Sequence, residues 1–203
     1  MIGVKIEDLF RSPGQIKVLR VLWRSAPPLS GRQVQRLSGL ANLAAMQSLK
    51  KLGDLGIISC RRAGRSYQFE LKREHWIVST LISPLFENED KLLDALMSEL
   101  DRGLAGKCLS AYLYGSAVSP AHGPVGDLDL FLVLKDEKRK KLFETDVLPE
   151  LGGKISRRFG LFLEPKIVTR PELSRRSLKS LVEAVLREGS KIRGKNLRDL
   201  IGI

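Results

Sequence analysis

The 203-residue sequence predicts an α+β protein built from two modules. Apolar residues recur at helical spacing through the first 55 or so positions, and two short alternating runs around a glycine follow them. In the second half, apolar runs such as "DLDLFLVL" are typical of buried strands and are separated by amphipathic segments. We therefore expect two domains, 1–82 and 106–203, joined by an amphipathic helix over 83–105.

The composition is that of a soluble globular chain, with 43% hydrophobic and 29% charged residues. No apolar run approaches the roughly 20 residues needed to span a bilayer, so no membrane partner is expected. Glu7 and Asp8 lie in an N-terminus that lacks a long apolar core, which argues against a signal peptide. Cys60 and Cys108 lack metal-ligand spacing and are expected to be free thiols. Together these features predict a cytoplasmic protein.

The net charge of +12 is unevenly distributed along the chain. It amounts to +9 over residues 1–80, −4 over 81–105 and +7 over 106–203. Two basic modules separated by an acidic bridge are suited to polyanionic partners. The alternative, that the excess charge only maintains solubility, remains open.

The first module carries signals for three helices and a hairpin. Ser12-Pro13 and Ser30 mark two helix starts, and Gly39 marks the turn before a third helix. Two alternating runs around Ala63-Gly64-Arg65 predict a β-hairpin. Three helices and a basic-tipped hairpin form the winged helix-turn-helix pattern, whose expected core positions include Ile16, Leu19, Val34, Leu37, Ala45, Leu49 and Leu52.

The phrase "LKKLGDLGIISCRRAGRSYQF" resembles the third helix and wing of bacterial and archaeal winged helix-turn-helix transcription regulators. The resemblance implies a third helix in the major groove of DNA and a wing against its backbone. The implied DNA-binding residues are Asn42, Gln47 and Lys50 on the helix and Arg61, Arg62 and Arg65 on the wing. Many winged helices instead bind protein or dimerise, and the small or apolar Ala44, Met46 and Ser48 argue against strong base readout.

The acidic bridge predicts an amphipathic helix. One face of residues 87–104 carries Leu92, Leu93, Leu96, Leu100 and Leu104. This face would pack on one of the modules or pair with a second copy, so a homodimer is one expectation.

Two carboxylates interrupt the most apolar strand of the second module. Asp127 and Asp129 point to the same face of that strand, about 6.6 Å apart along the backbone. Neighbouring carboxylates repel, and burying them unpaired is costly. A divalent cation that prefers oxygen ligands, Mg²⁺ or Mn²⁺, would resolve this cost. Upstream, Gly115 permits close backbone approach to a ligand, and the Ser116 hydroxyl can hold phosphate oxygens.

Gly-Ser, ten residues, then Asp-x-Asp resembles the signature of the DNA polymerase β-like nucleotidyltransferase superfamily, especially its small "minimal" branch. The resemblance covers residues 105–195 and implies a mixed sheet flanked by helices. It implies that Gly115 and Ser116 bind the phosphates of a nucleoside triphosphate and that Asp127 and Asp129 bind the metal. Such an enzyme moves a nucleoside monophosphate to an acceptor hydroxyl.

The superfamily normally uses a third carboxylate from a neighbouring strand. The segment "GLFLEPKIVTRPEL" offers Glu164 for this catalytic role, whereas aligning "KIVT" with the usual strand would place Lys166 there. Three functions therefore remain open: a nucleotidyltransferase that binds ATP or another triphosphate; a DNA-binding transcription regulator whose nucleotidyltransferase fold is inactive or senses nucleotides; and an antitoxin-like partner of a toxin protein.

Overall fold

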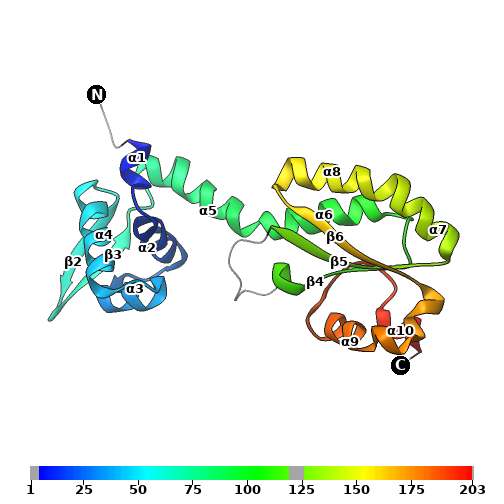
Figure 1. Cartoon of the computed structure of the whole chain (residues 1–203). Helices are drawn as coiled ribbons and strands as arrows, with labels where there is room; N and C mark the ends of the chain where they lie inside the picture. The colour runs from blue at the N-terminus through cyan, green and yellow to red at the C-terminus, as the bar shows by residue number, and fades with distance from the viewer. Residues whose placement is uncertain (1–4, 119–125, 203) are drawn as a thin grey trace. The chain divides into compact units, whose positions relative to one another are not determined.

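The computed structural model describes residues 5–118 and 126–202 and shows an α+β chain (Figure 1). It divides into two compact units, Met1–Lys91 and Leu92–Ile203. The segment predicted as one connecting helix is instead two helices, α5 (Ser83–Asp90) and α6 (Leu92–Leu104). Phe86 of α5 belongs to the core of the N-terminal unit, whereas the buried leucines of α6 belong to that of the C-terminal unit. The boundary therefore lies at Lys91, and Leu92 and Leu93, predicted on the packed face, are exposed.

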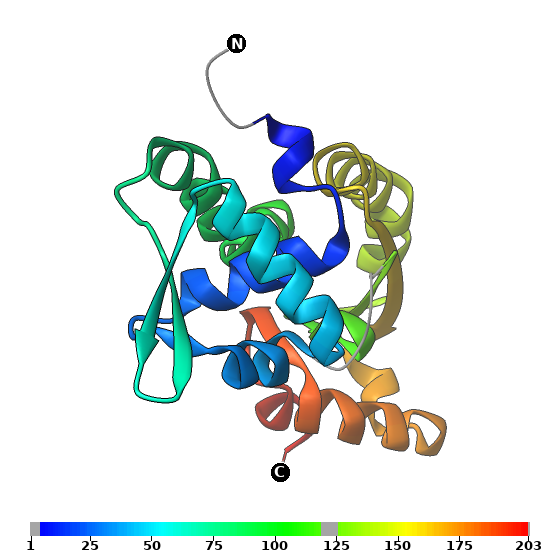
Figure 2. The same ribbon diagram turned by 90° about the vertical axis from the view of Figure 1, so that its left-hand side faces the viewer.

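The N-terminal unit combines helices with a small antiparallel sheet of order β1-β3-β2. The β2–β3 hairpin extends from the helices as a wing (Figure 2). In chain order the elements are α1 (Ile6–Leu9), α2 (Pro13–Arg24), β1 (Leu29–Ser30), α3 (Gly31–Ser38), α4 (Asn42–Asp54), β2 (Ile58–Ala63), β3 (Ser66–Leu71), a π-helical turn (Val78–Ile82) and α5.

Local chemistry accounts for these boundaries. Ser12 Oγ accepts a hydrogen bond from the Gln15 amide at 3.3 Å and caps α2. Ser30 and Gln33 form a reciprocal capping box at the start of α3. Gly64, with φ of +60°, closes the hairpin where Ala63 pairs with Ser66. One predicted core position was wrong. Leu37 is 57% exposed, because the buried face of α3 is formed by Val34 and Ser38.

Helix α5 is anchored to α2 inside the N-terminal unit. Arg20 donates two hydrogen bonds to Glu89, at 2.8 and 2.7 Å, and its guanidinium lies over the Phe86 ring. The Trp23 and Phe86 ring centroids are 5.6 Å apart. Aromatic packing and a bidentate ion pair therefore hold the end of this unit together.

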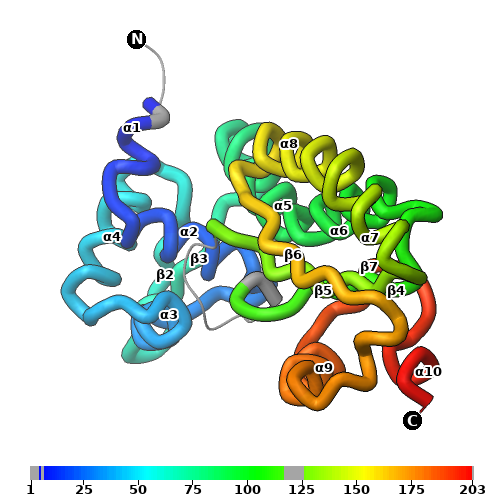
Figure 3. The backbone as a smooth tube through the Cα atoms, turned by 45° about the vertical axis from the view of Figure 1, so that its right-hand side comes forward, coloured from blue at the N-terminus to red at the C-terminus, as the bar shows by residue number. Residues whose placement is uncertain are grey.

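The C-terminal unit is a four-stranded mixed sheet between two helical layers (Figures 1 and 3). The strand order is β6-β5-β4-β7; β5 and β6 are parallel, and β4 is antiparallel to both β5 and β7. The elements after α6 are β4 (Ser110–Tyr114), a 3₁₀ turn (Gly115–Val118), β5 (Asp127–Leu134), α7 (Glu137–Leu142), a π-helical turn (Phe143–Val147), α8 (Leu148–Phe159), β6 (Phe162–Thr169), 3₁₀ turns (Arg170–Ser174 and Arg176–Leu178), α9 (Lys179–Glu188), β7 (Ser190–Gly194) and α10 (Leu197–Ile201).

Strand β5 is buried on both faces along its C-terminal half. Leu130 and Leu132 pack in the core shared with α6 and α8, whereas Phe131 and Val133 pack in the core shared with α9 and α10. Parallel strands covered on both sides characteristically read as continuous apolar runs. The two aspartates occupy the N-terminal end of this strand, where burial decreases.

One buried carboxylate joins the two helices over the first face. The Glu99 side chain of α6 is 1% exposed and forms ion pairs with Arg102 at 2.8 Å, with Lys154 at 2.5 Å and with Arg158. The hydrogen bond from Lys154, with the charges of Arg102 and Arg158, holds the pKa of Glu99 below its ordinary value despite burial. This cluster ties α6 to α8 and fixes the layer on which the sheet rests.

Candidate functional site

A glycine turn at the end of β4 receives the carboxylate of Asp129. Gly115 adopts φ of +73°, and a Cβ added there would lie 2.2 Å from Asp129 Oδ2. Glycine is therefore required at this position twice, by its left-handed backbone and by the close approach of Asp129. The half-buried Ser116 follows in the same turn. The structure thus brings Gly115 and Ser116 next to Asp129, which lies 13 positions after Ser116 in the sequence.

The two aspartates share one face of β5, as their spacing predicts. Asp127 is exposed and Asp129 is half-buried, at the end of the strand that the helical layers leave uncovered. Asp129 pairs with Tyr114 across the β4–β5 ladder. Both carboxylates are therefore within reach of a ligand bound at the Gly115 turn.

Strand register decides the position of the third carboxylate candidate. Asp129 is in register with Glu164 across the parallel β5–β6 pair, and Asp127 is in register with Phe162. Residues in register on neighbouring strands project from the same face and lie about 4.8 Å apart. Glu164 therefore lies beside Asp129, whereas Lys166 pairs with Phe131 one step farther into the sheet. Both Glu164 and Lys166 are exposed.

Tyr114 and Phe162 are members of the site that sequence reasoning missed. Burial raises the pKa of Tyr114, and the negative charges of Asp129 and Glu164 raise it further, which places its phenol near both acids. Phe162 is 61% exposed beside Asp127, and its amide donates to Gly126 O at 2.9 Å. Only the pairing of β4, β5 and β6 reveals these neighbours, because their sequence positions carry no motif.

The acidic row has the donor chemistry expected of a magnesium or manganese site. Asp127, Asp129 and Glu164 offer carboxylate oxygens, the ligands that hard divalent cations prefer. Over residues 5–118 and 126–202, no group of three or more His, Cys, Asp or Glu side chains is already gathered as a metal-binding cluster. The absence of a side chain at Gly115 lets the Asp129 carboxylate lie against the turn, and the two aspartates fit a cation that retains water ligands and also binds substrate phosphates.

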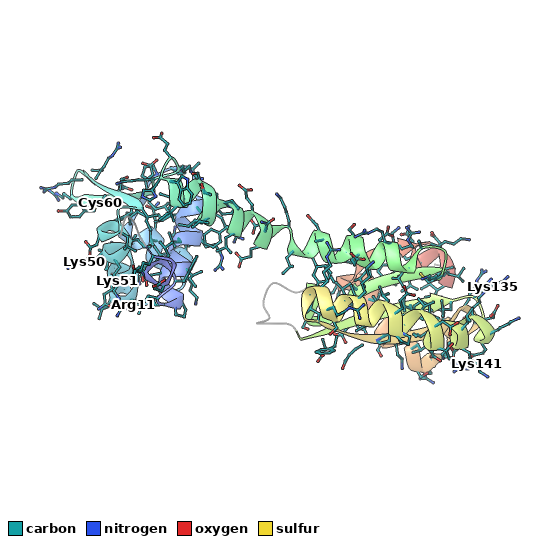
Figure 4. All side chains as sticks on the ribbon, turned by 90° about the horizontal axis from the view of Figure 1, so that it is seen from above. Arg11, Lys50, Lys51, Cys60, Lys135 and Lys141 are labelled. Carbon is teal, nitrogen blue, oxygen red and sulfur yellow. The ribbon has the colours of Figure 1, made fainter. Side chains whose placement is uncertain are left out.

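The residues predicted to bind DNA all lie on the exposed surface of the N-terminal unit. Asn42, Gln47 and Lys50 are exposed along α4, where Figure 4 labels Lys50. The wing residues Arg61, Arg62 and Arg65 are also exposed, and none of the three forms an ion pair with another described residue.

Helix α4 and the wing contribute to one surface. Met46 of α4 and Arg65 and Tyr67 of the wing line a common hollow of about 590 Å³. Leu43 and Met46 of α4, 70% and 42% exposed, are apolar and cannot form the hydrogen bonds by which base edges are read. This surface is therefore better equipped for phosphates than for bases.

No family model and no curated protein matches the chain. Among solved structures, it is similar to a toxin–antitoxin structure with AMP-PNP, at 18% identity and a TM-score of 0.37 over 52% of this chain and 78% of that one. It is also similar to the spectinomycin adenyltransferase of Enterococcus faecialis with ATP and spectinomycin, at 18% identity and a TM-score of 0.36 over 53% of this chain and 57% of that one. A transcriptional regulator of Thermotoga maritima matches at 18% identity and a TM-score of 0.34, over 73% of this chain and 78% of that one. All three TM-scores lie below 0.5.

Within the described residues, no helix combines the length and apolar character needed to cross a membrane.

Proposed function

We propose that the C-terminal unit is a metal-dependent nucleotidyltransferase, which transfers a nucleoside monophosphate from a nucleoside triphosphate to an acceptor hydroxyl and releases pyrophosphate. One observation carries this proposal. The Asp129 carboxylate lies against the Gly115 turn on one side and in register with Glu164 on the other. A glycine turn and two carboxylates therefore lie next to one another in the sheet, which supports a site for a metal and phosphates.

Each residue of the row has a role that follows from its place. The amides of the Gly115 turn and the Ser116 hydroxyl would hold phosphate oxygens on the β4 side. Asp127 and Asp129 would hold Mg²⁺ or Mn²⁺, which supplies charge neutralisation to the phosphates when bound. In an in-line displacement the attacking oxygen approaches opposite the leaving pyrophosphate, hence from the β6 side. Glu164 lies on that side and would accept the proton of the attacking hydroxyl as its oxygen bonds to the α-phosphorus.

The test is transfer of label from α-³²P-labelled ATP, and from the other triphosphates, to candidate acceptors in the presence of Mg²⁺ or Mn²⁺. We expect transfer by the natural chain and none by the double variant Asp127→Asn, Asp129→Asn. Glu164→Gln should slow transfer strongly while leaving triphosphate binding nearly unchanged. Glu144→Gln, an exposed substitution on the π-helical turn outside the site, is the matched control. Undiminished transfer by the double variant would overturn the assignment of the site.

We propose further that the N-terminal unit binds duplex DNA through the wing and α4. Two observations support this proposal. Arg61, Arg62, Arg65 and Lys50 are all exposed, and the N-terminal unit that carries them has a net positive charge. Arginine contacts to phosphates are independent of sequence and weaken with salt. Gel-shift or anisotropy binding should fall markedly in the triple alanine variant of the wing. DNA binding without any nucleotide transfer would favour a regulator whose nucleotidyltransferase fold senses nucleotides.

A further inference from the structure

The end of the C-terminal sheet away from the carboxylates is strongly basic. Strand β5 begins at Asp127 and ends at Leu134, so Lys135 emerges at its opposite end. Helix α7 and the turn before β4 meet there, and Figure 4 shows Lys135 and Lys141 at this end of the unit. Two adjoining surface hollows, of about 180 and 570 Å³, share Lys135 and Arg139 in their linings. Five cations surround these hollows: Lys107, Lys135, Lys138, Arg139 and Lys141.

These five cations are not neutralised by the acids around them. Among the described residues, none of the five side chains forms an ion pair, whereas the neighbouring Lys140 pairs with Glu172 at 3.6 Å. Asp136 is the acid that lines the hollows, and its Oδ1 already accepts the Arg139 amide at 2.9 Å as the N-cap of α7. Gathering five like charges is unfavourable unless an external anion offsets the repulsion. With Asp136 and with Glu137 of the same helix counted against the five cations, a net charge of +3 remains (five minus two), which suits a polyanionic ligand.

The chemistry of the lining selects the kind of anion. Four of the five cations are lysines, which bind phosphates as point charges without the fixed geometry needed to read bases. Among the residues that the structure describes, no aromatic side chain lines either hollow, so unpaired bases would find no surface there on which to stack. Leu142 is the large apolar side chain exposed on this helix of six residues, which is too little to insert into a bilayer. These features favour the sugar-phosphate backbone of a duplex.

We propose that this surface, formed by Lys107, Lys135, Lys138, Arg139 and Lys141, binds the phosphate backbone of double-stranded nucleic acid without sequence preference. It is separate from the wing of the N-terminal unit and from the acidic row at the other end of the sheet. The proposal for this surface does not require nucleotide transfer by the acidic row, because phosphate binding here depends only on the arrangement of the five cations.

The test uses the full chain with the wing arginines replaced by alanine, so that the remaining affinity reports on the C-terminal unit. Binding to a labelled duplex of arbitrary sequence is measured by fluorescence anisotropy over a series of salt concentrations. The surface variant is Lys135→Gln, Lys138→Gln, Lys141→Gln. The control variant removes the same charge from exposed cations on the α9 and α10 side: Arg176→Gln, Lys179→Gln, Arg198→Gln. Circular dichroism checks that all variants are folded.

Each lost phosphate contact should reduce the slope of log K against log salt by about 0.9. We therefore expect the surface variant to lower the slope by up to about 2.7 and the affinity near 0.15 M salt by on the order of 100-fold. The control variant should change affinity only a few-fold. Equal losses in the two variants would reduce the effect to net charge and overturn the proposal. Unchanged duplex binding by the surface variant would also overturn the proposal. If the same variant lost binding to phosphatidylserine vesicles, the surface would be a membrane-binding surface instead.

Discussion

The two ends of the C-terminal sheet carry opposite charge and would bind their ligands by different physical means. At one end, Asp127, Asp129 and Glu164 form a row set by strand register and by one glycine. At the other end, five cations gather from a turn, a strand end and a short helix. Between them β5 is buried on both faces, so charged side chains are confined to the points where the strand leaves the helical layers.

The two ends should differ in how well they tolerate single substitutions. As a nucleotidyltransferase site, the acidic row would depend on the positions of a few atoms, because a metal and a phosphate would have to be held in one geometry. Duplex binding at the basic end would depend mainly on the number of charges, because each phosphate contact adds a similar, salt-dependent increment. Single substitutions should therefore nearly abolish function at the acidic end and produce graded losses at the basic end.

Asp129→Asn is expected to have the largest effect. It removes a candidate metal ligand at the centre of the row while keeping the shape of the side chain, and loss of even outer-shell partners costs 10–100-fold. We expect nucleotide transfer to fall by at least about 100-fold, with duplex affinity unchanged. Label transfer and anisotropy on the same preparation test this. Loss of both functions together would show that the substitution unfolds the unit instead.

Gly115→Ala should damage the same end through geometry alone. A left-handed φ costs a non-glycine residue about 1–2 kcal/mol, and the added methyl would overlap Asp129 Oδ2. We expect a lower free energy of unfolding in urea and a loss of transfer comparable to that of Asp129→Asn. Gly152→Ala, inside α8 with nothing within 4 Å of its added Cβ, is the matched control. That control should be stabilising by about 0.5–1 kcal/mol, and equal destabilisation by the two variants would contradict this account of the turn.

Glu99→Gln should alter the pH dependence of stability in the layer between the two ends. The pKa of Glu99 is held below its ordinary 4.5, so the folded unit binds fewer protons there than the unfolded chain. This contribution is present above about pH 4.5 and is lost as the pH falls through the lowered pKa. We expect the variant to have a lower Tm at neutral pH and a shallower fall in Tm on acidification. Parallel Tm–pH curves for variant and natural chain would rule out this role.

Lys141→Gln should have the smallest effect. One of five charges is removed, so the salt slope should fall by about 0.9 and the duplex affinity only a few-fold. Transfer of label should not change, because Lys141 lies at the opposite end of the sheet from the acids. A loss of affinity as large as that of the triple surface variant would contradict the graded response.

Much of the N-terminal unit follows from sequence because its signals are local. The caps at Ser12 and Ser30 and the hairpin turn at Gly64 each involve residues within three positions of one another. The burial of Ala45, Leu49 and Leu52 follows from helical periodicity alone. Leu37 was misplaced because periodicity gives a helical face but not how much of that face the neighbouring helices cover.

The C-terminal unit was less predictable where pairing is non-local. Strand β7 is short and basic, and its sequence carries no alternating pattern; it is a strand because Ser110 pairs with Gly194 and its neighbours follow. The break at Lys91 was missed because one amphipathic pattern runs through α5 and α6, although each helix packs in a different core.

By itself, the sequence determined helices α2, α3 and α4, the wing, and the presence of two aspartates on one strand face near a Gly-Ser turn. A period of two residues placed Glu164 and Lys166 on one face but could not say which of them lies beside Asp129. Only the parallel register of β5 and β6 decided that, and only the pairing of β4 with β5 brought Lys107 to Lys135. Local patterns are specified by neighbouring residues, whereas register depends on how distant strands bury their apolar faces together.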